Sequence, residues 1–167
     1  NMIGRGNAIA IDSSGNVCIS GTYSSEVYNV DVPSTDGNSL IGKLVPTTRG
    51  AAFLIKYDNA GVAQWATRVD GTDANNGDDE GRNLAIDSSG NLYLTGSYNG
   101  YSEDAGRSRA YSAGDSSSIE LPLANNNSAL LIKYSSDGIP EWVKTINASG
   151  NVIGHGVAVD SGSNVFI

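Results

Sequence analysis

The chain has 167 residues and a formal net charge of −8, from 10 Lys and Arg against 18 Asp and Glu. Because phosphate recognition needs a basic patch, this balance argues against nucleic-acid partners, and no apolar run approaches the roughly 18 residues that cross a bilayer. A single cysteine, Cys18, and a single histidine, His155, exclude a disulfide framework, a cysteine-based zinc site and a multi-histidine metal centre within one chain.

The chain contains an internal repeat of about 75 residues, the kind of period that marks repeat architectures. The segment Ile11–Asn16 recurs unchanged as Ile86–Asn91, and a more divergent copy lies at Val159–Asn164. A second motif, Leu-Ile-Lys-Tyr, stands at 54–57 and again at 131–134, and a tryptophan follows each copy. The repeated positions that we single out as structural are Asp12, Asp87, Asp160, Gly15, Gly90, Lys56, Lys133, Trp65 and Trp142.

Each unit contains four predicted strands, which are short and rich in β-branched and aromatic residues. Gly, Ser and Asn make up 60 of the 167 residues, a composition that favours turns and short strands over helices. In the first unit the predicted strands are Asn7–Ile11, Asn16–Thr22, Ala51–Tyr57 and Ala63–Val69. In the second they are Asn83–Ile86, Asn91–Ser97, Ala129–Tyr134 and Pro140–Ile146.

Two tight hairpins are predicted in each unit. The sequence Asp-Ser-Ser-Gly-Asn joins the first two strands, with Asp at the turn start and Gly supplying a positive φ. The segments Asp58–Gly61 and Ser135–Gly138 join the third and fourth strands in the same way. One unit is therefore two hairpins joined by a longer connection.

The predicted fold class is all-β, built from four-stranded antiparallel blades of the β-propeller type. A β-helix would need shorter and more even coils, and a sandwich would not repeat its sequence so faithfully. Runs such as Ala52–Ile55 are apolar without alternation, as expected when neighbouring blades cover both faces of a sheet.

The units resemble the SBBP family of β-propeller repeats, found in bacterial surface proteins and in large-virus and environmental sequences. The resemblance lies in the Asp-Ser-Ser-Gly-Asn segments and in the Lys-Tyr pairs followed by Gly and Trp. The segments that carry it are Gly6–Tyr23, Ala52–Val69, Gly81–Tyr98, Ala129–Ile146 and Gly154–Ile167. It implies a fold but no catalytic residues, because propellers host many unrelated functions.

The predicted organisation is residues 1–70 as one unit, 71–147 as a second and 148–167 as the first half of a third. Two blades and a part of a third are incomplete as a single closed propeller, which needs roughly four to eight blades. Three explanations stay open. The chain is a piece of a longer protein, or copies complete one another, or the half-blade packs back on this chain. Unpaired strand edges that meet head to tail would build a filament.

Two inserts, at 24–50 and 99–127, separate the second and third strands of the two units. Connections of this length are usually functional or disordered. The alternating run Glu26–Val32 predicts extra strands, whereas the second insert is more polar. The inserts are either blade decoration that covers an edge or a ligand and partner surface.

An acidic cluster between the units is a candidate calcium site, because Ca²⁺ prefers carboxylate and amide oxygens. Its candidate ligands are Asp70, Asp73, Asn75, Asp78 and Asp79. The spacing departs from the calcium-loop pattern at Gly77, and the alternative is a solvated turn between blades.

No catalytic constellation is predicted. The carboxylates Asp78, Asp79 and Glu80 are adjacent in sequence and so do not flank a scissile bond, as a glycosidase pair must. We expect His155 to be a strand or rim residue, because it has no partner in a recognisable arrangement. Lys56 and Lys133 recur at equivalent positions, which favours structural roles, and the two recurring tryptophans predict a core between blades.

Asn126 and Asn147 match the N-glycosylation pattern in predicted loops, and if the host is eukaryotic and the protein is secreted, Asn126 is expected to be the better site. No signal peptide is visible in the sequence. The acidic, Ser- and Asn-rich composition and the family resemblance nevertheless predict an extracellular or particle-surface location.

The predicted function is that of a non-enzymatic structural or assembly protein built from β-propeller repeats, polymerising by strand or blade completion between chains. The expected partners are copies of itself or further blades of a longer chain, with no cofactor other than the candidate calcium. The alternative is a binding module that recognises a glycan or a protein through the insert loops.

Overall fold

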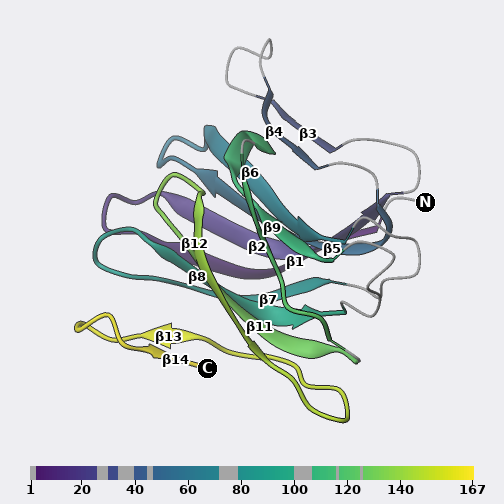
Figure 1. Ribbon diagram of the computed structural model, residues 1–167. Helices are drawn as coiled ribbons and strands as arrows, with labels where there is room; N and C mark the ends of the chain where they lie inside the picture. Colours follow the sequence, from purple (N-terminus) through teal and green to yellow (C-terminus); the bar gives the residue numbers. More distant parts are fainter. Residues whose placement is uncertain are drawn as a thin grey trace.

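The structure is a computed structural model of the chain, and it describes residues 3–25, 30–33, 40–44, 47–71, 79–99, 107–115, 117–124 and 126–167. Two antiparallel sheets dominate it, and a short hairpin lies beneath them (Figure 1). The predicted all-β fold with blade-like antiparallel sheets is confirmed. Among the described residues, no helix has the length and apolar character needed to cross a membrane.

The first blade is formed by the four strands predicted for the first unit. They are β1 (Ile3–Ile11), β2 (Val17–Ser25), β5 (Thr47–Tyr57) and β6 (Ala63–Asp70), hydrogen-bonded in that order. β1 and β5 begin four residues earlier than predicted, since backbone pairing continues beyond the apolar motif on which each prediction rests.

The second blade repeats this arrangement. Its strands are β7 (Glu80–Ile86), β8 (Leu92–Tyr98), β11 (Ser128–Tyr134) and β12 (Pro140–Ile146), again paired in chain order. The registers also repeat: Ile9 pairs with Ile19 in the first blade, and Leu84 pairs with Leu94 in the second. The sequence repeat is therefore a repeat of backbone path.

The third unit contributes the hairpin of β13 (Ala158–Val159) and β14 (Val165–Phe166). The first blade, the second blade and this hairpin form successive layers, with β7 lying against β1 and β2 and β13 lying against β7 (Figure 1). Hydrogen bonds join the layers: Asn7 Nδ2 donates to the Gly81 carbonyl (2.7 Å), and the Gly154 N–H donates to the Gly96 carbonyl (3.0 Å).

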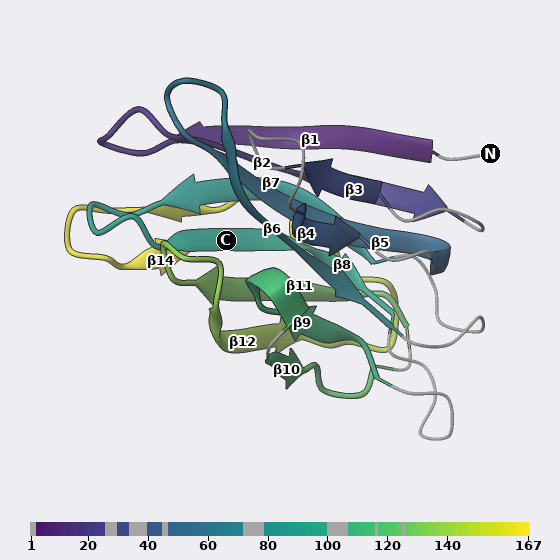
Figure 2. The same ribbon diagram turned by 90° about the horizontal axis from the view of Figure 1, so that it is seen from above.

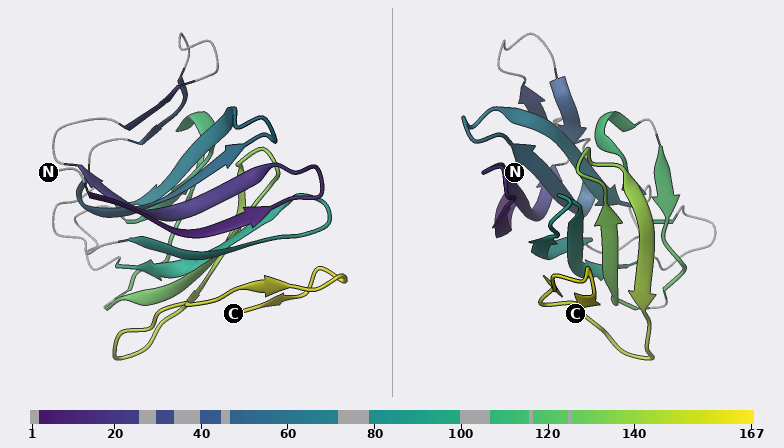
Figure 3. Two further views of the ribbon diagram at one scale, coloured as in Figure 1. Left: turned by 180° about the vertical axis from the view of Figure 1, so that it is seen from behind. Right: turned by 90° about the vertical axis from the view of Figure 1, so that its left-hand side faces the viewer.

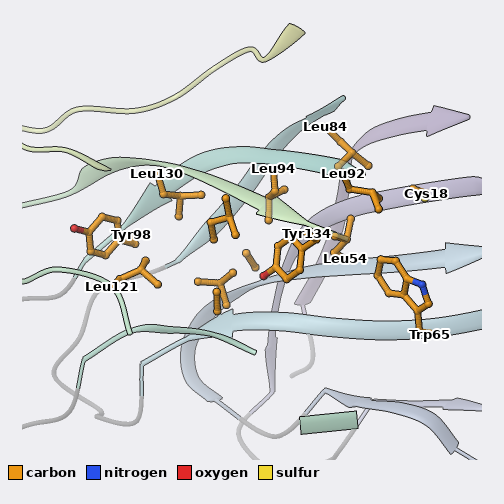
Figure 4. Close-up of a cluster of buried hydrophobic side chains, with 14 of the residues drawn as sticks. Cys18, Leu54, Trp65, Leu84, Leu92, Leu94, Tyr98, Leu121, Leu130 and Tyr134 are labelled. Carbon is orange, nitrogen blue, oxygen red and sulfur yellow. The ribbon is translucent and has the colours of Figure 1, made fainter. Parts of the chain in front are cut away.

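The larger of two apolar clusters lies mainly between the two blades (Figure 4), and a smaller one groups Tyr23, Leu44 and Ala51. The largest fully buried side chains of the larger cluster include Tyr98, Tyr134, Leu54, Leu92, Leu94, Leu121, Leu130 and Ile132. All seven residues of β8 are buried, which explains why that strand shows no alternation of polar and apolar residues. Burial of this apolar surface is the main force that holds one blade on the next.

Both inserts form extra strands. In the first, β3 (Val30–Pro33) and β4 (Leu40–Leu44) pair as a ribbon, so the predicted extra strand is found in part, while 26–29 lie outside the described residues. In the second, β9 (Arg109–Tyr111) and β10 (Ser118–Glu120) flank a short 3-10 turn, η1 (Ala113–Asp115). The β3–β4 ribbon and the β13–β14 hairpin lie at opposite ends of the stack (Figure 3).

The second insert crosses to the first blade. β9 pairs with β6, with Val69 opposite Ala110 and Asp70 opposite Arg109, which enlarges that sheet to six strands (Figure 2). Ala110, Leu121 and Ala124 of the insert are buried in the core between the blades. This part of the insert is thus edge cover, the first of the two interpretations left open by the sequence.

Candidate functional site

The repeated aspartates build hairpin turns. Asp12 Oδ1 accepts hydrogen bonds from the backbone N–H groups of Ser14 and Asn16 (both 2.9 Å), and its Oδ2 accepts one from Asn16 Nδ2 (2.8 Å). The same three bonds recur at Asp87 and at Asp160. The conserved spacing of the motif is therefore explained by turn geometry.

These bonds also stabilise the charged form of each carboxylate. Burial of Asp12 and Asp87 opposes ionisation, but the Asn16 and Asn91 side chains and the backbone donors outweigh it, so both pKa values lie below their ordinary value. At Asp160 the Asn164 amide is the main cause of a lowered pKa. All three carboxylates act in the structure as hydrogen-bond acceptors.

The fourth residue of each of these turns has a positive φ. Gly15 (φ 81°) and Gly90 (φ 82°) meet this requirement without strain, as predicted. In the third unit the order of Gly and Ser is reversed, so Ser163 takes the position with φ 62°. The third hairpin therefore contains a strained residue that the other two lack.

The repeated lysines have different partners in the two blades. Lys56 Nζ lies 3.4 Å from Asp12 Oδ2, whereas Lys133 Nζ lies 2.8 Å from Glu141 Oε2. In the second blade the hydroxyl of Tyr93 donates to Asp87 instead (3.1 Å), at the position that Cys18 occupies in the first. The side-chain hydrogen bond to Glu141 raises the pKa of Lys133. Both lysines have structural partners.

Trp65 lies between the two blades. Its Nε1–H donates to the carbonyl of Ser136 (3.0 Å), in the turn that joins β11 and β12, and Lys56 Nζ reaches the same oxygen (3.4 Å). Gly138 of that turn packs closely against the indole: a Cβ at this position would lie 2.9 Å from two carbons of the Trp65 ring. The first blade thus holds the second through a tryptophan, a lysine and a glycine turn.

Trp142 has a different environment from Trp65. It packs at the edge of Tyr93 in its own blade (ring centroids 6.0 Å apart, planes at 56°) and is only half buried. The prediction of a core between blades thus describes Trp65 but not Trp142, because the described residues place no outer hairpin beneath β11 and β12.

The outer face of the first blade is uncovered. Ile9 and Ile11 alternate on one face of β1 and are 65% and 64% exposed, while Ala8 and Ala10 of the other face pack on the core. The counterpart of Ile9 in the second blade is Leu84, which is 6% exposed because the first blade covers it. The exposed pair therefore lies where a blade would stack.

The candidate calcium ligands are only partly described. Asp73, Asn75 and Asp78 lie outside the described residues. Asp70 is buried and accepts a hydrogen bond from Arg68 Nε (2.8 Å), and buried Asp79 accepts one from the Asn99 N–H (3.0 Å). Calcium binding at this cluster stays a prediction.

The remaining candidate residues lie at the surface. His155 is exposed at the start of the third unit, and Asn147 is exposed beyond the end of β12. Asn126 is half buried, donates to the Ser149 carbonyl (3.1 Å) and precedes a buried Ser128. Of the two predicted glycosylation sites, Asn147 is the more exposed, and glycosylation of either stays a prediction.

Sequence reasoning missed the glycines that let strands and blades approach closely. A Cβ at Gly21 would lie 1.9 Å from the Arg5 carbonyl oxygen, and one at Gly96 would lie 1.8 Å from that of Glu80. Each contact lies at a β-bulge in the first hairpin of its unit, at Gly6/Ala8 in the first unit and at Gly81/Asn83 in the second. The recurrence of Gly21 as Gly96, 75 residues later, was the signal that could have found them.

Comparison with known proteins supports the same architecture. The chain is 26% identical, over 98% of its length, to a protein of Acanthamoeba polyphaga mimivirus described as an uncharacterized WD repeat-containing protein. The chain spans 12% of the length of that relative. Repeat families of this kind suggest a protein-interaction or structural module and are typically non-enzymatic.

A family model also matches part of the chain. Residues 64–101 match SBBP, described as a beta-propeller repeat. The match runs from β6 of the first blade to just beyond β8 of the second, across the junction of the two units. The segment from β6 to β8 therefore matches the SBBP beta-propeller repeat, as the resemblance predicted, and it lies within a stack of blade-like sheets.

Proposed function

We propose that this chain is a non-enzymatic structural module that assembles by stacking its blades on further blades of the same kind, at a cell exterior or particle surface. The observation that carries the proposal is the uncovered face of the first blade. Ile9 and Ile11 are exposed, whereas Leu84, the counterpart of Ile9, is buried in the core, and Ile86, the counterpart of Ile11, is partly buried against it. Covering one such side chain contributes about 1.5–3 kcal/mol, so this face favours association.

The repeated polar residues support a structural role over a catalytic one. The aspartates bind turn N–H groups, and the lysines bind carboxylates and a turn carbonyl. The buried residues of the second insert, Ala110 and Leu121, likewise favour packing over ligand recognition, the alternative function. A binding role of the insert loops would depend on residues other than these.

The test is self-association of the full chain. Light scattering coupled to size exclusion, together with electron microscopy, is expected to show masses above the 17.3 kDa of one chain that grow with concentration. The double variant Ile9→Thr, Ile11→Thr should remain monomeric, because both changes keep β-propensity while removing apolar surface. A monodisperse monomer of the wild-type chain at every concentration would reject the proposal.

A matched control is available in Ile139, which is 50% exposed in the turn between β11 and β12 and lies away from the stacking face of the first blade. Ile139→Thr removes one exposed isoleucine, against two in the double variant, and should leave the assembly unchanged; the single variant Ile9→Thr is the size-matched comparison and should weaken it. Equal loss of assembly in both variants would indicate unspecific hydrophobic aggregation instead of blade stacking.

A further inference from the structure

We propose that Trp142 and Lys133 form a docking site for the turn between the third and fourth strands of a following repeat unit. The inference rests on the proposed function, because it names the residues that receive the next blade. It concerns the opposite end of the stack from Ile9 and Ile11, so the two can fail separately.

The template is the contact between the two blades. Trp65 Nε1 and Lys56 Nζ both reach the Ser136 carbonyl, at 3.0 and 3.4 Å, and Gly138 lies against the indole. The turn Ser135–Gly138 thus presents two features to the first blade: a carbonyl acceptor at its second residue and a glycine (φ 76°) at its fourth.

The second blade carries the same two donors in the same register. Lys56 is paired with Trp65 across β5 and β6, and Lys133 is paired with Trp142 across β11 and β12. Both members of each pair point to one face of the sheet, because directly opposed residues in antiparallel strands share a face. In the part of the chain that the structure describes, no hydrogen bond engages Trp142 Nε1.

The surrounding face is uncovered where its counterpart is covered. Ile146 is 50% exposed, and its counterpart Val69 is 1% exposed. Lys144 is exposed on the same face, whereas its counterpart Thr67 is buried. Among the residues that the structure describes, no blade lies beneath the outer half of the second blade, whereas the second blade lies beneath that of the first.

The hairpin of the third unit determines where the next strands of that unit would lie. Its hairpin β13–β14 already lies beneath β7, held by the Gly154 N–H to the Gly96 carbonyl (3.0 Å) and by the Val157 N–H to Asn83 Oδ1 (3.4 Å). In both complete blades the third strand pairs with the second, as β5 does with β2 and β11 with β8. A third strand paired with β14, and the turn after it, would therefore lie beneath β11, β12 and Trp142.

The experiment extends the full chain in register. Residues Thr95–Asn147 are appended after Ile167, which is the counterpart of Leu94, and the appended copy of Trp142 is replaced by Phe so that two indoles remain. Hydrogen exchange of the indole N–H groups is followed by NMR, with Trp65 as the protected internal reference. Trp142 should exchange fast in the original chain and on the order of tenfold or more slowly in the extended one.

A matched control carries Gly138→Val in the appended turn alone. A side chain there would meet the indole and a β-branched residue disfavours positive φ, so Trp142 should stay fast while the appended strands become protected. If Trp142 stays fast in the unmodified extension although those strands are protected, the docking site is wrong and blade stacking still stands.

A second measurement applies if the appended strands do not fold. A peptide of residues 128–147 with Trp142→Phe is titrated into the original chain, and the indole resonances are followed. A saturable shift of Trp142 with Trp65 unmoved supports the site. No shift of Trp142 at the highest peptide concentration overturns it.

Discussion

Leu84 and Ile9 occupy the same position in successive units, yet Leu84 is 6% exposed and Ile9 is 65% exposed. Leu84 is buried because the first blade covers it, whereas no described blade covers Ile9. The burial of a side chain in this architecture is set by its neighbour in the stack, so the energetic role of a repeated residue depends on which unit carries it.

The tryptophan contact can be measured through stability. Trp65→Phe should lower the free energy of unfolding by about 1–3 kcal/mol, because it removes a donor and leaves the part-buried Ser136 carbonyl with only the longer contact to Lys56 Nζ. Trp142→Phe, at the equivalent position, should have a smaller effect in the original chain. Urea denaturation of both variants checks this, and equal losses would contradict it.

The close approach at Gly96 predicts a large cost for any side chain. Gly96→Ala should destabilise the fold by about 2–4 kcal/mol, since its Cβ would lie 1.8 Å from the Glu80 oxygen and the strands would have to separate. Gly4→Ala is the control, because nothing lies within 4 Å of a Cβ there. Thermal unfolding that is unchanged by Gly96→Ala would refute the close contact.

The third turn should be improved by restoring glycine. Ser163→Gly is expected to stabilise the β13–β14 hairpin by about 1 kcal/mol, because it relieves a positive φ. The reverse change, Gly90→Ser, should destabilise the matching turn of the second unit. Amide hydrogen exchange in each hairpin measures both effects, and changes of the same sign would be inconsistent with this account.

The turn aspartates predict a loss of stability in acid. Their pKa values are lowered in the folded state, so their contribution is present above the unfolded value of 3.8 and is lost as the pH falls through the lower folded values. Unfolding of Asp87→Asn should therefore depend less on pH between about pH 5 and pH 2 than that of the wild-type chain. A steeper dependence in the variant would be evidence against this linkage.

Cys18 offers a probe of unfolding. The thiol is buried, and burial raises its pKa to about 11, so little reactive thiolate exists at neutral pH. A thiol reagent should label the native chain slowly and the urea-unfolded chain at the rate of a free cysteine. Fast labelling without denaturant would show that β2 is accessible in the native state.

Much of the fold is predictable from the sequence, and the reason lies in local chemistry. The Asp12 and Asp87 turns depend on residues four positions apart, and the strands beside them on their own composition. The pairing of β9 with β6 is not predictable in this way. Arg109–Tyr111 is too short to show a period, and its burial depends on a sheet built from a segment about 40 residues earlier.

The same distinction between local and long-range causes applies to the candidate site. The recurrence of Trp65 as Trp142 predicts equivalent roles, and the sheets do place them equivalently. Their surroundings differ because burial depends on the blade that comes next. For the acidic cluster, the described carboxylates Asp70 and Asp79 have protein hydrogen-bond donors, which sequence spacing alone does not reveal.

The crossing of β9 from the second unit into the sheet of the first has a consequence for how such a protein can grow. A duplicated gene segment that encodes one unit would also encode a strand equivalent to β9, which pairs with the last strand of the preceding unit. A new unit could then be added to the stack without a separate linking segment. Deletion of a unit at its sequence boundaries would leave the last strand of the preceding blade with an unpaired edge.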